Sequence, residues 1–255
     1  RKYLDVTLSQ VDRALFRELQ RYSRVLSQRN TLLRSIREGR AGPQELSFWD
    51  REMVEAGSFI IAKRLRAIRE LDELSREIHR ELTGKQEELS LVYLPSIQLR
   101  DMNSESGLSD AFIKSLERLQ GKEILAGVSL CGPHRDDFQF QVNCLELGVF
   151  GSRGQQRTAA LSLKLAEVHF IRARVNDQPV LLLDDVLSEL DGFRRSYLLS
   201  WIKEAGQAFL TTTDPANADQ EFLRGSTLFK VTRGSVESPA QAILGNRVAS
   251  KEQAN

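Results

Sequence analysis

The feature that most constrains this chain of 255 residues is an apolar run that ends in two adjacent carboxylates. Residues 180–183 read Val-Leu-Leu-Leu, and Asp184 and Asp185 follow at once. An unbroken apolar run is typical of a strand buried on both faces of a mostly parallel sheet. Because open α/β sheets bind their ligands at the carboxyl ends of the strands, the sequence predicts a site at these two acids.

Two adjacent acids at the end of a buried strand are costly unless a cation or a proton shares them. In a nucleotide-hydrolysing enzyme, Asp184 would hold Mg²⁺, directly or through water, and Asp185 would orient or deprotonate the attacking water. The alternative is a strand that ends in solvated acids, and the run LLLDD taken alone favours that alternative. The motifs on either side of this strand favour the nucleotide site over the solvated acids.

Polar turns lie on both sides of this strand. Residues 152–156 read SRGQQ, about one helix and a turn ahead, and residues 188–191 read SELD, directly behind. Ser152 and the backbone N–H groups around Gly154 precede a helix that we expect to begin near Arg157. Such groups at a helix start form an anion site that suits a γ-phosphate.

The sequence LLLDDVLSELD resembles, position by position, the Walker B motif and D-loop of ATP-binding-cassette (ABC) ATPases, and SRGQQ stands where they carry their signature loop. In that superfamily the signature loop contacts a nucleotide held by the other protomer, so the motifs also imply a homodimer. The resemblance implies the following roles: metal binding for Asp184, catalysis for Asp185, the D-loop for Ser188 and Asp191, and trans contacts to ATP for Ser152, Gly154, Gln155 and Gln156.

Four blocks narrow the resemblance to the RecF family of bacterial recombination mediators: GQQRTAALSLKLAE at 154–167, LLLDDVLSELD at 181–191, GPHRDD at 132–137 and RNTLL at 29–33. The resemblance implies an ATP-dependent dimer that holds DNA at gaps or at single-strand/double-strand junctions and releases it after slow hydrolysis. It also implies ATP and Mg²⁺ as cofactors, RecR and RecO as partners in recombinase loading, and the bacterial cytoplasm as location.

The fold class expected from this resemblance is α/β: the C-terminal half of an ABC-type ATPase head with an inserted α-helical hairpin arm. Apolar spacing predicts helices over 8–36 and 46–82, which Gly39 and the Gly42-Pro43 step separate into a hairpin. We assign residues 1–120 to the helical arm, with a short strand at 88–94, and residues 121–255 to the C-terminal part of the head. Further expected elements are helices at 109–119 and 193–204 and strands at 138–142, 208–210 and 229–232.

No G-x-x-x-x-G-K-[ST] phosphate loop occurs in the 255 residues. RecF proteins carry that loop near the N-terminus, ahead of a sequence that the opening Arg-Lys-Tyr-Leu-Asp resembles. The resemblance therefore implies a C-terminal piece of a weak ATPase. We expect this chain by itself neither to bind ATP tightly nor to hydrolyse it.

The strand expected at 208–210 ends in Thr-Thr-Thr-Asp-Pro, and Thr213 falls at the switch position. Transporter-type cassettes place a histidine there, where it bonds the γ-phosphate. A hydroxyl makes a weaker, uncharged contact, so slow turnover is expected.

Positive charge gathers at the start of the chain, where residues 1–40 hold ten Arg or Lys against four acids. Arg13, Arg17, Arg21 and Arg24 share one stripe of the first expected helix. Arginines at this spacing can follow a DNA phosphate backbone. The alternative is a solvated face partly paired with neighbours such as Glu18. The GPHRDD turn also allows two interpretations. Its ionisable groups would contact nucleotide or the partner subunit, which we favour slightly, or they would bond among themselves as a self-satisfied network.

Composition excludes little. The net charge of +1 indicates no partner, no apolar run approaches the length of a membrane span, and the two cysteines form no CxxC pair. Two other classes remain as alternatives: a structural ATPase related to the chromosome-cohesion (SMC) proteins and a transporter subunit. An arm of about 60 Å is short for a long tether, and the missing switch histidine argues against a transporter.

Overall fold

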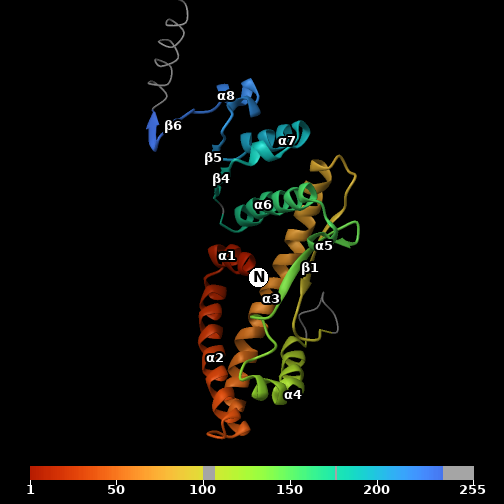
Figure 1. Cartoon of the computed structure of the whole chain (residues 1–255), viewed down its shortest axis with the longest axis vertical. Coiled ribbons are helices and arrows are strands. Elements are labelled where there is room, and N and C mark those ends of the chain that lie inside the picture. The colour runs from red at the N-terminus through yellow and green to blue at the C-terminus, as the bar shows by residue number, and fades with distance from the viewer. Residues whose placement is uncertain (100–106, 176, 238–255) are drawn as a thin grey trace, which may run out of the picture. The chain divides into compact units, whose positions relative to one another are not determined.

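The computed structural model describes residues 1–99, 107–175 and 177–237, which form two compact units, Arg1–Asp177 and Gln178–Asn255. The α-helices are α1 Lys2–Val11, α2 Arg13–Arg37, α3 Leu46–Leu82, α4 Leu108–Ala126, α5 Leu147–Phe150, α6 Arg153–Val175, α7 Gly192–Lys203 and α8 Gln220–Arg224 (Figure 1). The strands are β1 Leu89–Leu94, β2 Asp137–Val142, β3 Leu145–Glu146, β4 Val180–Asp184, β5 Gln207–Thr211, β6 Lys230–Thr232 and β7 Ser235–Glu237. Short 3₁₀ turns lie at Pro43–Glu45, Val186–Glu189 and Pro215–Asn217.

The helical hairpin is built from α2 and α3, which pack side by side in Figure 1. The second helix spans the predicted residues 46–82. The single helix predicted over 8–36 is wrong, because Asp12 adopts an extended conformation and divides it into α1 and α2. The Asp12 carboxylate accepts hydrogen bonds from the backbone N–H groups of Ala14 and Leu15 at 2.9 and 3.0 Å, so Asp12 is the N-cap of α2.

A fully buried arginine joins three segments of the first unit. Arg29 Nε lies 2.7 Å from Asp50 Oδ1, Arg29 Nη2 lies 2.7 Å from Glu123 Oε2, and Nη1 donates to Ser129 Oγ at 2.8 Å. Arg29 and Glu123 are completely shielded from solvent. Helix α4, which carries Glu123, extends to Ala126 rather than ending near 119 as expected, so this carboxylate is presented from a helix.

We expect Arg29→Met to lower the free energy of unfolding of this chain by about 3–5 kcal/mol, because it leaves the Glu123 charge buried without its partner. Urea unfolding followed by circular dichroism measures the effect. Arg34→Met, at an exposed position on the same helix, is the matched control and should change the value by less than about 0.5 kcal/mol. Equal effects of the two changes would contradict a structural role for the buried pair.

Strand β1 pairs antiparallel with β2, from Leu89 opposite Val142 to Leu94 opposite Asp137, and β3 extends this sheet. The pairing joins segments from both sides of the boundary that we placed at residue 120. The compact units divide after Asp177 instead. Residue 120 is therefore not a boundary between compact units, and the assignment of 1–120 to the arm and 121–255 to the head stays a prediction.

Helix α6 is attached to the arm helices within the first unit. Arg174 Nη2 near its C-terminal end lies 2.5 Å from Glu70 Oε2 of α3. In its middle, Glu167 accepts hydrogen bonds from the hydroxyls of Tyr3 and Thr7 on α1. The helix that follows the signature turn is thus fastened directly to the hairpin.

The second unit contains the parallel pair β4 and β5, in register from Val180 opposite Gln207 to Asp184 opposite Thr211. Leu181 is buried, but Leu182 is 78% exposed and its neighbour on β5, Phe209, is also exposed. The prediction that this strand is buried on both faces is therefore wrong for this chain: the face that carries Leu181 is covered, and the face that carries Leu182 is exposed. The strand predicted near 229–232 forms as β6, while the segment beyond Gly245 lies outside the described residues.

Within the described ranges, no helix is both long enough and apolar enough to cross a membrane.

Candidate functional site

The predicted signature turn is a helix N-terminus closed by two reciprocal hydrogen bonds. The Ser152 backbone N–H donates to Gln155 Oε1 at 2.9 Å, and the Gln155 backbone N–H donates to Ser152 Oγ at 3.2 Å. This is a capping box, and it starts α6 at Arg153, four residues before the expected Arg157. Ser152 and Gly154 are exposed, so the first turn of α6 is accessible from solvent. This arrangement suits an anion.

Gln155 is held in turn by residues that the sequence reading did not assign to the site. Its Nε2 donates to Glu87 Oε1 at 2.9 Å, and Glu87 Oε2 lies 3.0 Å from His79 Nε2. The other ring nitrogen of His79 lies 3.1 Å from Ser162 Oγ on α6. His79 is completely buried. Glu87 therefore connects the signature turn to the end of α3.

Glu87→Ala should loosen the first turn of α6, because it removes the partner of the Gln155 side chain and leaves buried His79 with one partner fewer. We expect backbone amide exchange at residues 155–156 to become roughly 2–10-fold faster, the equivalent of one lost hydrogen bond. Glu88→Ala is the matched control, since that neighbouring side chain is exposed. Exchange unchanged by Glu87→Ala would show that the capping box alone holds the turn.

The predicted Walker B acids, Asp184 and Asp185, lie at the end of β4 in the second unit. Thr211 Oγ1, opposite on β5, donates to Asp184 Oδ1 at 2.6 Å and accepts from the Asp185 backbone N–H at 3.0 Å. Asp185 has a left-handed backbone (φ 47°), and its Oδ1 atom is buried without a hydrogen-bond partner among the described residues. A buried carboxylate oxygen without a protein partner is commonly satisfied by a water molecule or an ion. Sequence reading missed Thr211, whose position follows only from the register of β4 and β5.

The remaining predicted residues of this unit have distinct positions. Ser188 Oγ donates to the Asp185 backbone oxygen at 2.8 Å, which ties the predicted D-loop to the predicted Walker B acids. Asp191 is the N-cap of α7, accepting from the Arg194 backbone N–H at 2.9 Å. Thr213 is exposed in the turn behind β5. Gln156, in the first unit, donates through Nε2 to the Leu147 and Gly151 backbone oxygens at 3.2 and 3.3 Å.

In the GPHRDD turn at 132–137, Asp136 is buried and His134 is half-buried, while Arg135 and Asp137 are exposed. Asp136 is buried and accepts from Tyr93 Oη at 2.6 Å, and His134 Nδ1 lies 2.7 Å from Tyr22 Oη. Burial lowers the pKa of His134 to about 4, so the ring is neutral at pH 7. Its contribution to stability is complete above pH 6.5 and is lost as the pH falls towards 4. The contacts favour a self-satisfied network over the nucleotide or partner contact that we preferred.

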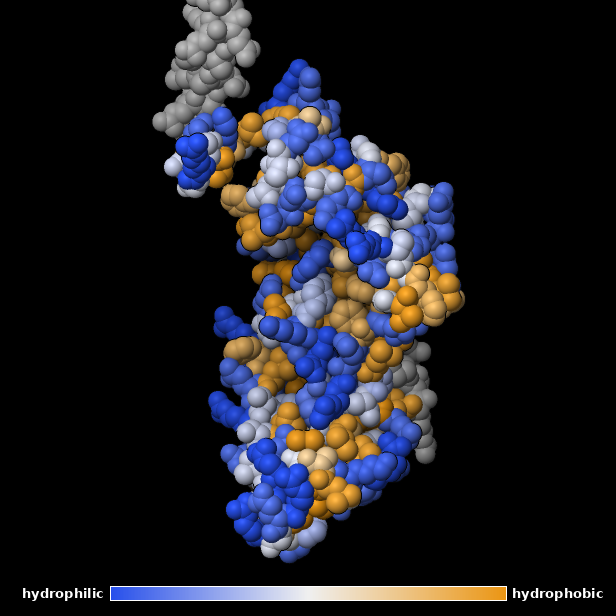
Figure 2. All heavy atoms as spheres, in the orientation of Figure 1, coloured by the Kyte–Doolittle hydropathy of each residue, from blue (hydrophilic) through white to orange (hydrophobic). Residues whose placement is uncertain are grey.

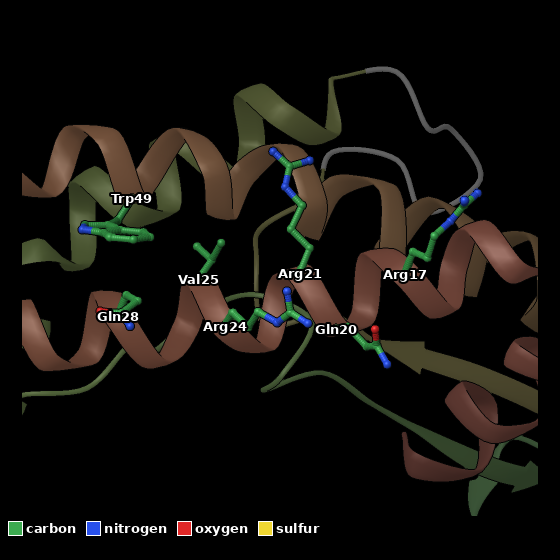
Figure 3. Close-up of a pocket in the computed structure, with 7 residues that line it drawn as sticks. All are labelled: Arg17, Gln20, Arg21, Arg24, Val25, Gln28 and Trp49. Atoms are coloured by element: carbon green, nitrogen blue, oxygen red, sulfur yellow. The ribbon is translucent and has the colours of Figure 1, made fainter.

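The predicted arginine stripe on α2 consists of Arg13, Arg17, Arg21 and Arg24. Arg21 Nη2 lies 2.8 Å from both Glu52 Oε2 and Glu55 Oε2 of α3, and these bonds raise its pKa further. Arg21 therefore links the two helices of the hairpin. Arg13, Arg17 and Arg24 are exposed. In Figure 3, Arg17, Arg21 and Arg24 line a shared groove together with Trp49 of α3.

Comparison with known proteins extends these observations. No family model matches the chain. Proteins named "DNA replication and repair protein RecF" match over nearly all of it: 43% identity over 241 residues in Chloroflexus aurantiacus and 41% over 239 residues in Bacillus mycoides, covering 92% and 93% of the chain. The relative from Herpetosiphon aurantiacus is 44% identical over 239 residues. The chain belongs to the RecF family.

The chain spans about three fifths of the length of these RecF relatives: 62%, 64% and 60% for the three organisms. It also superposes on two solved structures described as "the recombination mediator protein RecF-ATPrS in RecFOR pathway" and the corresponding RecF-ATP. The TM-scores are 0.81 and 0.82, at 33% and 32% identity, over 93% of this chain and 62% and 61% of theirs. The predicted α/β fold of an ABC-type ATPase with a helical hairpin is confirmed.

Proposed function

We propose that this chain is part of an ATP-controlled DNA-binding protein of recombinational repair that dimerises around nucleotide. The observation that carries the proposal is the pair of motifs: a capped, solvent-facing signature turn at Ser152 and a Walker B strand that ends in Asp184 and Asp185. RecF relatives at 41–44% identity support the same activity.

Each residue has a defined part in this proposal. Asp184 holds Mg²⁺, which needs only one or two protein carboxylates besides phosphate oxygens and water. Asp185 orients and deprotonates the attacking water. Ser152, Gly154, Gln155 and Gln156 form the turn that receives the γ-phosphate of a nucleotide held by the other protomer. Ser188 and Asp191 shape the D-loop, and Thr213 supplies an uncharged contact consistent with slow turnover.

An apolar patch beside the signature turn supports the dimer. Leu145, Val149 and Phe150 are exposed, Phe150 at 71%, and they immediately precede Ser152 in the chain. Figure 2 shows hydrophobic side chains gathered over α5 and β3. Exposed apolar patches of this kind mark protein interfaces. A second copy of the protein that docks on the signature turn would cover this patch.

The complete protein would act on gapped DNA or single-strand/double-strand junctions in the bacterial cytoplasm, with RecR and RecO as partners, as the RecF resemblance implies.

The alternative, an SMC-like structural ATPase, is disfavoured by the length of the arm. Helix α3 has 37 residues and is about 56 Å long, which is short for a chromosome tether.

The test of DNA binding is the salt dependence of affinity. In the complete protein with ATP, Arg17→Ala/Arg24→Ala should reduce the slope of log affinity against log salt concentration by about two, because two phosphate contacts are lost. The loss should be similar for all DNA sequences. Arg51→Ala, an exposed arginine of α3 outside the groove, is the control. An unchanged slope would leave the stripe as a solvated face.

A further inference from the structure

A regular row of side chains runs along α2 beside the hairpin groove. Arg17, Gln20, Arg24 and Gln28 recur every three or four residues, so they share one side of the helix over about 16 Å. Together with Val25 and Trp49 they line a groove of about 370 Å³. Figure 3 shows the Trp49 indole reaching from α3 towards α2, beside Val25 and Gln28. The row alternates cations with amides and ends at an aromatic ring.

Two of the three arginines that line this groove, Arg17 and Arg24, have no ion-pair partner in the part of the chain that the structure describes. The nearby acids already have partners: Glu18, Glu52 and Glu55 bond to Arg21, and Asp50 bonds to Arg29. Arg17 and Arg24 are exposed, seven residues and thus about 10.5 Å apart along α2. The three carboxylates around Arg21 equal the three groove arginines in charge, so the contribution of Arg17 and Arg24 is local: each can donate to a phosphate at its own position.

The aromatic end of the groove narrows the kind of ligand. Phe48 meets Trp49 edge to face, with ring centroids 5.0 Å apart, which restricts the orientation of the indole. Aromatic rings beside a cationic track are the usual means by which proteins hold unpaired bases. A duplex keeps its bases stacked inside, so its bases cannot meet this ring. A groove of about 370 Å³ has room for a base.

We propose that this groove binds single-stranded DNA, with phosphates at Arg17 and Arg24, amide hydrogen bonds from Gln20 and Gln28, and one unpaired base against Trp49. The proposal rests on the DNA binding proposed above and adds the strandedness of the contact: the arm holds the single-stranded side of a junction. An acidic peptide would use the two arginines but gain nothing from stacking.

The experiment measures affinity of the complete ATP-bound protein for a duplex with a single-stranded thymidine tail and for the same duplex without the tail. Trp49→Ala should weaken binding of the tailed DNA on the order of tenfold and leave the blunt duplex unchanged, whereas Trp49→Phe should retain most of the affinity. Equal losses on both DNAs, or no loss, overturn the proposal. A wild-type protein that binds neither DNA contradicts the proposed function itself.

A second measurement needs no substitution and guards against a variant that fails to fold. A single strand that carries 5-iodouracil is photocross-linked to the wild-type protein, which is then cleaved with trypsin. The adduct is expected on the peptide of residues 41–51, which contains Trp49. Adducts confined to other peptides overturn the proposal, as does displacement of the strand from residues 41–51 by oligoglutamate at equal charge concentration.

Discussion

Asp185→Asn in the complete protein is expected to lower kcat for ATP hydrolysis by about 10²–10⁴-fold while ATP binding and ATP-dependent dimerisation persist. The substitution keeps the shape of the side chain and removes the group that accepts the proton from water. Asparagine also tolerates the left-handed backbone of this position (φ 47°), so folding should be unaffected. Phosphate release measures turnover, and sedimentation with ATP measures the dimer.

The matched control is Asp219→Asn, which exchanges the same groups at the N-cap of α8, where asparagine caps equally well. It should leave both turnover and dimerisation unchanged. A monomeric Asp185→Asn protein, or one that turns over at the wild-type rate, would contradict the role given to Asp185.

Ser152→Arg is expected to abolish ATP-dependent dimerisation while the protomer still binds nucleotide. Ser152 is exposed, so the protomer accommodates the larger side chain, and only the N-cap of α6 is lost, at about 1 kcal/mol. The guanidinium chain then occupies the volume that the partner's γ-phosphate would fill. Sedimentation of the complete protein with ATP reports the loss.

Two further variants distinguish the loss of the helix N-cap from the loss of the phosphate-binding position. Ser152→Asp keeps an N-cap oxygen but sets a negative charge against the phosphate, so it should also prevent dimerisation. Ser47→Arg, the same exchange at an exposed position near the tip of the arm, should dimerise normally. A dimeric Ser152→Arg protein would remove the signature turn from the subunit interface.

Periodicity along the chain was enough to predict the hairpin, because α2 and α3 each bury one apolar stripe against the other. It missed the break at Asp12, although an aspartate ahead of Arg-Ala-Leu is a recognisable N-cap. It also predicted a β4 buried on both faces, because the run Val-Leu-Leu-Leu shows how apolar a strand is and not whether other elements cover both of its faces.

Some residues of the candidate site could be predicted from the sequence, and others could not. Ser152, Asp184 and Asp185 could be read from the sequence because their motifs are contiguous. Glu87 and Trp49 could not, since the first lies 68 residues from Gln155 and the second joins the row on α2 only when the hairpin closes. Such residues are identified by contacts between segments, which no local pattern records.

The attachment of α6 to the arm has a mechanical consequence. Gln155 at its start is tied through Glu87 to the end of α3, and Arg174 near its far end is tied to Glu70 of the same helix. Two contacts far apart along α6 restrict its rotation relative to α3. A displacement of α3, such as the proposed binding of a strand to the hairpin could cause, is therefore expected to move α6 and with it Ser152.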